Sequence, residues 1–155
     1  MRSFLLLSVL AVSLFCLAST VKPISAAEQK IAEFHRSPGV PEEYPLRWGQ
    51  VVHGAHFHFK DLVFVANEEY IIKRAMPKWP YQVYEEMFVF GQHLDPILTT
   101  NLFTNEVGNM NGHFQLRLYL DGVPPPGATI SFRWMVYDLC WQRIVYETEW
   151  VEITF

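Results

Sequence analysis

His113 to Leu120 reads HFQLRLYL, and this stretch decides the fold class. Phe114 and the three leucines occupy every second position, and the residues between them include His113, Gln115 and Arg117. Successive side chains of a β-strand point to opposite faces, so the alternation predicts a strand with one buried and one wet face. ATISFRWMVY, residues 128–137, alternates in the same way and is predicted to bury Trp134.

The chain after Leu46 continues in this manner. Short runs rich in Val, Ile, Phe, Tyr and Trp are separated by Gly, Pro, Asn or Asp every eight to fifteen residues. No helical periodicity longer than about two turns interrupts them. We therefore predict an all-β fold, an antiparallel sandwich or barrel-like domain of about seven strands.

The same patterns predict one strand boundary and one buried tryptophan. Residues 61–73 are predicted to form two runs separated by a turn at Ala66-Asn67-Glu68. The last run, residues 143–155, is predicted to bury Trp150 on the same face as Tyr146.

The first 27 residues have the pattern of a secretory signal peptide. One Arg precedes an apolar run from Phe4 to Leu17, and a candidate cleavage site follows at Ser25-Ala26-Ala27. The run is shorter than the ~20 residues that a spanning helix needs. We expect a secreted, extracellular protein with no membrane span. Residues 28–45 carry three prolines and are predicted to form an extended arm with at most one helical turn, ahead of a single β domain over residues 46–155.

Charge and cysteine content narrow the function classes. Loss of residues 1–27 leaves ten basic against sixteen acidic residues, which changes the net charge from −4 to −6. No Lys/Arg cluster occurs along the sequence, so direct nucleic-acid binding is not expected. Cys140 would be the sole cysteine, which excludes an internal disulfide. Its apolar neighbours in VYDLCW predict a small buried side chain, with an intermolecular bridge as the alternative.

Several short motifs follow one another after the start of the domain. Trp48-Gly49 comes first, then Gly54, the pair Leu62-Val63 and the step Trp79-Pro80, and the motif TNxxxNxNG begins at Thr104. This order resembles a family of small insect secreted proteins, the family named for the second multiprotein bridging factor, which includes salivary secreted peptides and response-to-pathogen proteins. The corresponding residues in its hairpin, turn and strand would be Ile97, Thr104, Asn105, Gly108, Asn111, Gly112, Gly122, Val123, Thr129 and Ile130.

The resemblance implies an exported protein, induced in a tissue or under stress, that has no catalytic residues. The family name also implies a coactivator that bridges transcription proteins, and the signal peptide argues against that nuclear role. Two departures are evident: Leu102-Phe103 replaces an Asp-Gln pair of the family, and the apolar, acidic run MVYDLCWQRIVYE replaces a basic segment near the end. A partner surface that depends on the basic segment is therefore not carried over.

Three histidines lie close together in VVHGAHFHFK. On a flat strand His56 and His58 point the same way and His53 points the opposite way. His56 and His58 are therefore a candidate zinc or copper pair that still needs a third donor, for which Asp61, His93 and His113 are candidates. The alternative is a solvated, pH-sensitive strand face.

No enzyme motif occurs in the chain. It contains no nucleophile elbow, phosphate loop, Cys-His pair or HExxH sequence. Glu85-Glu86 and Glu147 with Glu149 offer carboxylates for glycoside chemistry, although alternating acidic residues usually form the wet face of a strand. We expect neither an enzyme nor a cofactor.

The tryptophans are the remaining candidates for binding. Trp134 and Trp150 are predicted to be core, whereas Trp79 and Trp141 lie in turn-like segments and are the better ligand-binding candidates. The sequence thus favours a secreted, non-catalytic β-domain protein that acts through protein or surface contacts, with a partner it does not identify. The alternative is a carrier or lectin-like module for a small apolar or carbohydrate ligand, and the transcription coactivator is a second alternative.

Overall fold

The computed structural model describes residues 28–155, so the predicted signal peptide lies outside the described residues. Nine strands form in this part of the chain, where about seven were expected. They are β1 (Glu28–Arg36), β2 (Trp48–His58), β3 (Val63–Lys73), β4 (Pro80–Val89), β5 (Gln92–Phe103), β6 (Met110–Tyr119), β7 (Thr129–Asp138), β8 (Arg143–Thr148) and β9 (Val151–Thr154).

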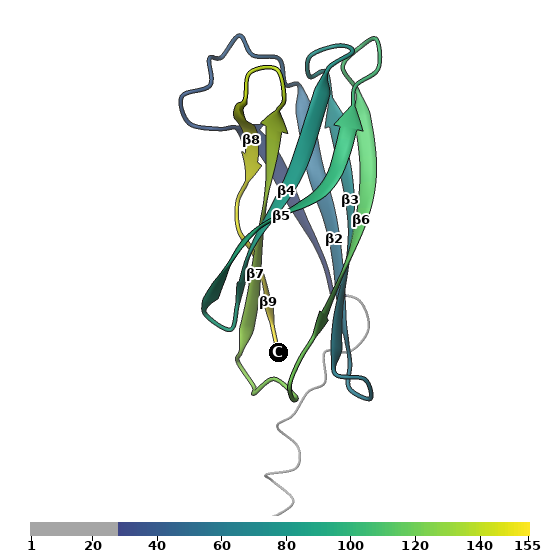
Figure 1. The fold of residues 1–155 in the computed structure, drawn as a ribbon, viewed down its shortest axis with the longest axis vertical. Coiled ribbons are helices and arrows are strands. Elements are labelled where there is room, and N and C mark those ends of the chain that lie inside the picture. The colour runs from purple at the N-terminus through teal and green to yellow at the C-terminus, as the bar shows by residue number, and fades with distance from the viewer. Residues whose placement is uncertain (1–27) are drawn as a thin grey trace, which may run out of the picture.

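The strands form one antiparallel sheet that curls into a nearly closed barrel (Figure 1). Its order is β5-β4-β7-β8-β1-β2-β3-β6, and β9 pairs with β7. The two edges of this order, β5 and β6, approach one another: a Cβ added to Gly112 of β6 would lie 2.7 Å from Leu102 Cδ2 of β5. The predicted all-β, sandwich or barrel-like fold is confirmed.

Large aromatic side chains fill the interior of the barrel. Trp134 is fully buried, with its ring stacked on Phe132 at 6.1 Å between centroids. The alternation in HFQLRLYL is confirmed, because Phe114 and the leucines are buried or half-buried and the residues between them are exposed. Burial of one face is what fixes the register of such strands.

The segment expected to be an arm contributes a strand. Residues 28–36 form β1, which pairs with β2 on one side and with β8 on the other. No helical turn forms in residues 28–36, because Ala32 and Phe34 alternate inward along β1. All three prolines of the segment follow residue 36, so they shape the connection to β2 and leave β1 uninterrupted.

The turn expected at Ala66-Asn67-Glu68 does not form. β3 continues through it and pairs along its length with β2 and β6. Asn67 accepts a hydrogen bond from Gln115 Nε2 of β6 at 2.7 Å on the outer face, and Glu68 finds buried partners on the inner face. These neighbours, which are distant in sequence, override the local preference for a turn.

The inward position predicted for Trp150 is wrong. β7 pairs with β8 as far as Met135↔Glu147 and resumes with β9 at Phe132↔Val151. Three residues of the chain therefore lie opposite two residues of β7, which shifts the alternation by one position. Trp150 is exposed as a result, although Tyr146 and Thr148 are buried as the pattern predicts.

Cys140 is exposed, which corrects the expectation of a buried thiol. It lies in the tight connection between β7 and β8, where its backbone N–H donates to Asp138 Oδ1 at 2.8 Å. Val136 and Tyr137 of the apolar run belong to β7, whereas Leu139, Cys140 and Trp141 form the turn and are exposed.

Candidate functional site

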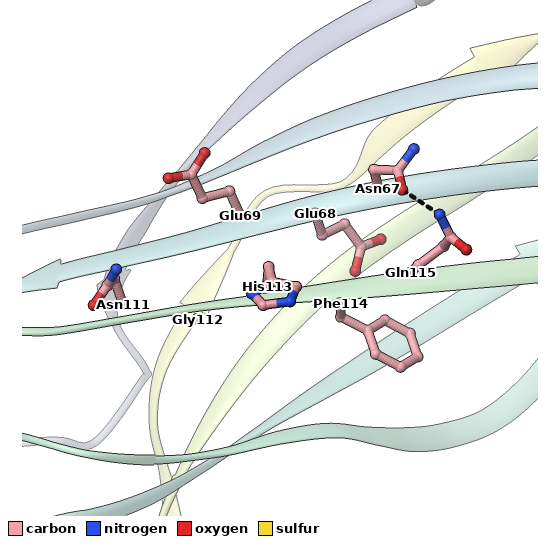
Figure 2. Close-up of a pocket in the computed structure, with 8 residues that line it drawn as sticks. All are labelled: Asn67, Glu68, Glu69, Asn111, Gly112, His113, Phe114 and Gln115. Carbon is pink, nitrogen blue, oxygen red and sulfur yellow. Dashed lines mark hydrogen bonds between the residues drawn. The ribbon is translucent and has the colours of Figure 1, made fainter.

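A cleft of about 580 Å³ lies along the outer side of β3 and β6 (Figure 2). Figure 2 shows side chains from both strands around it, and the burial patterns of the strands place Glu68 and Phe114 on the inner face. The lining residues are Asn67, Glu68, Glu69, Asn111, Gly112, His113, Phe114 and Gln115.

Two further hollows extend this cleft into a groove. The second, of about 340 Å³, shares Glu69 and Asn111 with the first. The third, of about 370 Å³, shares Lys73 and Asn109 with the second. We call the three together the β3–β6 groove; the second and third are also lined by Ile71, Asn105, Met110, Arg47, Trp48 and Arg74.

The register of β3 and β6 explains why polar groups line the groove. Asn67 lies opposite Gln115, Glu69 opposite His113 and Ile71 opposite Asn111. These positions alternate with the buried ones, so they form one continuous outer surface. Between residues 28 and 155, no hydrogen bond or ion pair engages the side chains of Glu69, Asn111 or His113, which leaves their polar atoms available to a ligand.

A buried polar cluster lies behind the groove. Glu68, which lines the first cleft, is 2% exposed and turns its carboxylate toward the interior. Tyr70 donates to Glu68 Oε2 at 2.8 Å, and His53 Nδ1 lies 3.2 Å from Glu68 Oε1. Burial and the charge of Glu68 raise the pKa of the Tyr70 hydroxyl, so Tyr70 stays a hydrogen-bond donor.

Glu85 of β4 belongs to the same cluster and is fully buried. Burial, reinforced by the neighbouring Glu68, raises its pKa well above the ordinary value. Among the described residues, neither oxygen of Glu85 has a hydrogen-bond partner, and the same is true of His53 Nε2 and Trp134 Nε1. The centre of the barrel therefore holds four buried polar atoms that have no hydrogen-bond partner among the described residues.

The structure brings the two predicted ligand-binding tryptophans together around Asp138. Trp79 Nε1 donates to Asp138 Oδ2 at 2.8 Å, and the backbone N–H of Trp141 donates to Asp138 Oδ1 at 2.9 Å. Tyr44 also donates to Asp138 and packs against the Trp141 ring at 4.7 Å. Trp79 uses its indole N–H internally, while Trp141 remains 45% exposed.

His56 and His58 share the outer face of β2, with ring centroids 4.5 Å apart. Partial burial and then the proximity of His58 lower the pKa of His56. His53 points to the other face, as the alternation predicts, and is fully buried. The region covered by residues 28–155 holds no group of three or more His, Cys, Asp or Glu residues that could bind a metal ion, so the pair has no third protein donor.

Glu85 and Glu86 lie on opposite faces of β4, so they are not the paired carboxylates of glycoside chemistry. Glu86 is outward and contacts Arg133 Nη2 at 2.5 Å and His93 Nε2 at 2.7 Å. Arg133 also lies over the Trp150 ring at 5.1 Å, and Phe88 packs against Trp150 at 5.2 Å. These side chains pair with one another and leave no free group for catalysis. We therefore infer that the cluster stabilises the chain at the break between β8 and β9.

No family model matches the chain, and no curated protein matches it either. No helix in residues 28–155 is long and apolar enough to cross a membrane.

Sequence reasoning did not find the β3–β6 groove. Its residues come from β2, β3 and β6, from the positions just before β2 and just after β3, and from the loop after β5. Alternation identifies faces without identifying neighbouring strands. The usable signal was the predicted wet face of HFQLRLYL, which includes His113 and Gln115.

Proposed function

We propose that this protein is a secreted, non-catalytic binding protein that holds an extended carbohydrate chain in the β3–β6 groove. The observation that carries the proposal is the continuity of three hollows lined by amide, carboxylate, imidazole and cationic side chains. Such planar polar groups match the paired donors and acceptors of sugar hydroxyls.

The dimensions of the groove fit a ligand of several rings. Strands rise about 3.3 Å per residue, so the span from Gln115 to Asn109 is roughly 20 Å. Trp48 is 38% exposed at the far end, where an aromatic face can stack on an apolar sugar face.

The sequence supports two parts of the proposal, namely that the protein is secreted and that it is not an enzyme. The signal-peptide pattern of residues 1–27 favours export, and no catalytic motif accompanies the groove. The resemblance to the insect bridging-factor family favours the same proposal, since it implies an exported protein without catalytic residues.

The proposal is tested by screening the purified protein against an array of neutral and acidic oligosaccharides and titrating the best ligand calorimetrically. The double variant Asn111→Ala with His113→Ala removes two exposed side chains that make no hydrogen bond or ion pair within residues 28–155. Each hydrogen bond contributes about 1 kcal/mol, so we expect the affinity to fall by roughly tenfold or more.

Gln82→Ala with Asn101→Ala is the matched control, because both side chains lie outside the groove on β4 and β5 and hydrogen bond to one another. It should bind like the unmodified protein. Failure of every oligosaccharide to bind would refute the proposal, as would equal losses in the two variants. Binding of an extended peptide in place of any sugar would also refute it.

A further inference from the structure

Three cations gather at the Trp48 end of the β3–β6 groove. Arg47, Lys73 and Arg74, with Trp48 and Asn109, line the hollow of about 370 Å³. We call this hollow the basic pocket. The sequence shows only two separated pairs, Arg47-Trp48 and Lys73-Arg74, so no cluster is evident there.

The hairpin of β2 and β3 brings the two pairs together. Trp48 lies opposite Lys73 in the register, and Arg47 N donates to Lys73 O at 3.1 Å. The β2–β3 pairing therefore sets both Arg47 and Lys73 at the same end of the sheet.

Arg74 is fixed by an unusual backbone conformation. Its φ is +56°, in the left-handed region that a long side chain rarely adopts. Arg74 N donates to the Asn109 Oδ1 at 3.0 Å, and the adjacent Ala75 N donates to Gly108 O at 2.9 Å. The loop before β6 thus holds Arg74 beside the pocket at a conformational cost.

The charges in the pocket are not neutralised by the fold. Lys30, Lys78 and Arg133 each have a carboxylate within 4.0 Å. Over the same residues, 28–155, Arg47, Lys73 and Arg74 have none. Three unpaired cations in one hollow of a chain with net charge −4 form a local positive field that attracts an anion.

We propose that the basic pocket binds the negatively charged group of an acidic sugar residue, a sulfate or a carboxylate, while Trp48 stacks on its ring. Arginine forms paired hydrogen bonds to such planar or tetrahedral oxyanions, and lysine adds a point charge. This inference rests on the proposed carbohydrate-binding function and specifies its ligand as an acidic oligosaccharide.

The test compares one oligosaccharide in neutral, sulfated and carboxylated forms, with inorganic sulfate as a fourth probe. The double variant Arg47→Gln with Lys73→Gln should lose about tenfold more affinity for both acidic forms than for the neutral form, because glutamine keeps hydrogen-bonding groups and removes only the positive charge. The affinity of the unmodified protein for the acidic forms should also fall as salt is raised, with a shallower slope in the variant.

Lys30→Gln with Lys60→Gln is the control, since it removes the same charge outside the groove. It should leave all affinities unchanged, and circular dichroism should show all proteins folded. The inference would be overturned if acidic ligands bound the pocket variant normally. The proposed function would still stand in that case if Asn111→Ala with His113→Ala abolished binding. Inorganic sulfate bound as tightly as the acidic oligosaccharide, or binding confined to phosphatidylserine vesicles, would overturn the inference too. Absence of binding to any oligosaccharide would overturn both proposals.

Discussion

Glu85 is an acidic residue with no exposed surface and no hydrogen-bond partner among the described residues. Burial and the neighbouring Glu68 raise the pKa of Glu85 well above the ordinary value of 4.5. Glu68 itself accepts a hydrogen bond from Tyr70 and lies beside His53. Because the folded state holds the Glu85 proton more tightly than the unfolded chain does, its contribution to stability is lost as the pH rises above about 4.5.

Glu85→Gln should therefore stabilise the protein near neutral pH. We expect a gain of about 0.5–2 kcal/mol at pH 7, the usual range for a stabilising substitution. The gain should shrink as the pH falls toward 4.5 and below, where the unmodified Glu85 is protonated in both states. Urea unfolding of the two proteins across this pH range measures the difference.

Glu86→Gln is the opposite control. Partial burial alone would raise the pKa of Glu86, but Arg133 and His93 hold it below its usual range. Its contribution is therefore present above pH 4.5 and lost in acid, so Glu86→Gln should weaken the fold at pH 7 and not at low pH. If both variants shift stability in the same direction at pH 7, our account of the buried cluster is wrong.

For single residues, the sequence predicted which side of a strand a side chain occupies better than it predicted the neighbours that the side chain meets there. Glu85 lies inward in β4 with Val83 and Met87, whereas the sequence alone indicated it only as one of two adjacent carboxylates. What cannot be read from that strand is why a carboxyl group is tolerated there, because its neighbours Glu68 and Tyr70 come from β3. The interior of the barrel is assembled from distant parts of the chain, so local patterns do not describe its chemistry.

The loop before β6 positions the end of the groove, and Gly108 is the residue on which its conformation depends. Gly108 has φ +80°, and an added Cβ would lie 2.0 Å from the backbone oxygen of Ala75. Gly127 has nearly the same φ, +83°, but nothing lies within 4 Å of its added Cβ. An alanine at Gly127 would therefore meet only backbone strain, whereas an alanine at Gly108 would meet the same strain and a steric collision.

Gly127→Ala should cost only the left-handed strain, about 1–2 kcal/mol. Gly108→Ala should cost several kcal/mol more, because the backbone of residue 75 must move, and the shift should also misplace Arg74. Chemical unfolding of both variants measures the contrast. Equal destabilisation would mean that the loop yields easily and does not fix the basic pocket.

At the element scale, most strands were predictable from alternation, and their ends were not. β3 runs through a polar Asn67-Glu68 segment because β2 and β6 pair with it on both sides. β8 and β9 separate at Glu149-Trp150, a break that is visible only against β7. The same limit hid the groove, since strand order is set by non-local pairing.

Across the whole molecule, β1 joins two halves of the sheet. Residues 28–33 pair with β2, and residues 34–36 pair with β8, so β1 links the β2-β3-β6 strands to the β5-β4-β7-β8 strands. Cleavage after Ala27, as the signal-peptide pattern predicts, would leave this strand intact with Glu28 as the first residue. The intact mass of protein collected from the medium of expressing cells tests that site.

A chain that begins at Ser37 should fail to fold cooperatively, whereas a chain that begins at Glu28 should fold like the secreted protein. Loss of β1 removes one of the two partner strands of β2 and of residues 146–148 of β8, and it uncovers the inward side chains that pack with Ala32 and Phe34. Urea unfolding followed by tryptophan fluorescence and by circular dichroism distinguishes the two chains, because coincident sharp transitions require one cooperative unit. A sharp transition with an unchanged midpoint in the chain that begins at Ser37 would show that the two halves of the sheet hold together without β1, and that residues 28–36 are an accessory arm after all.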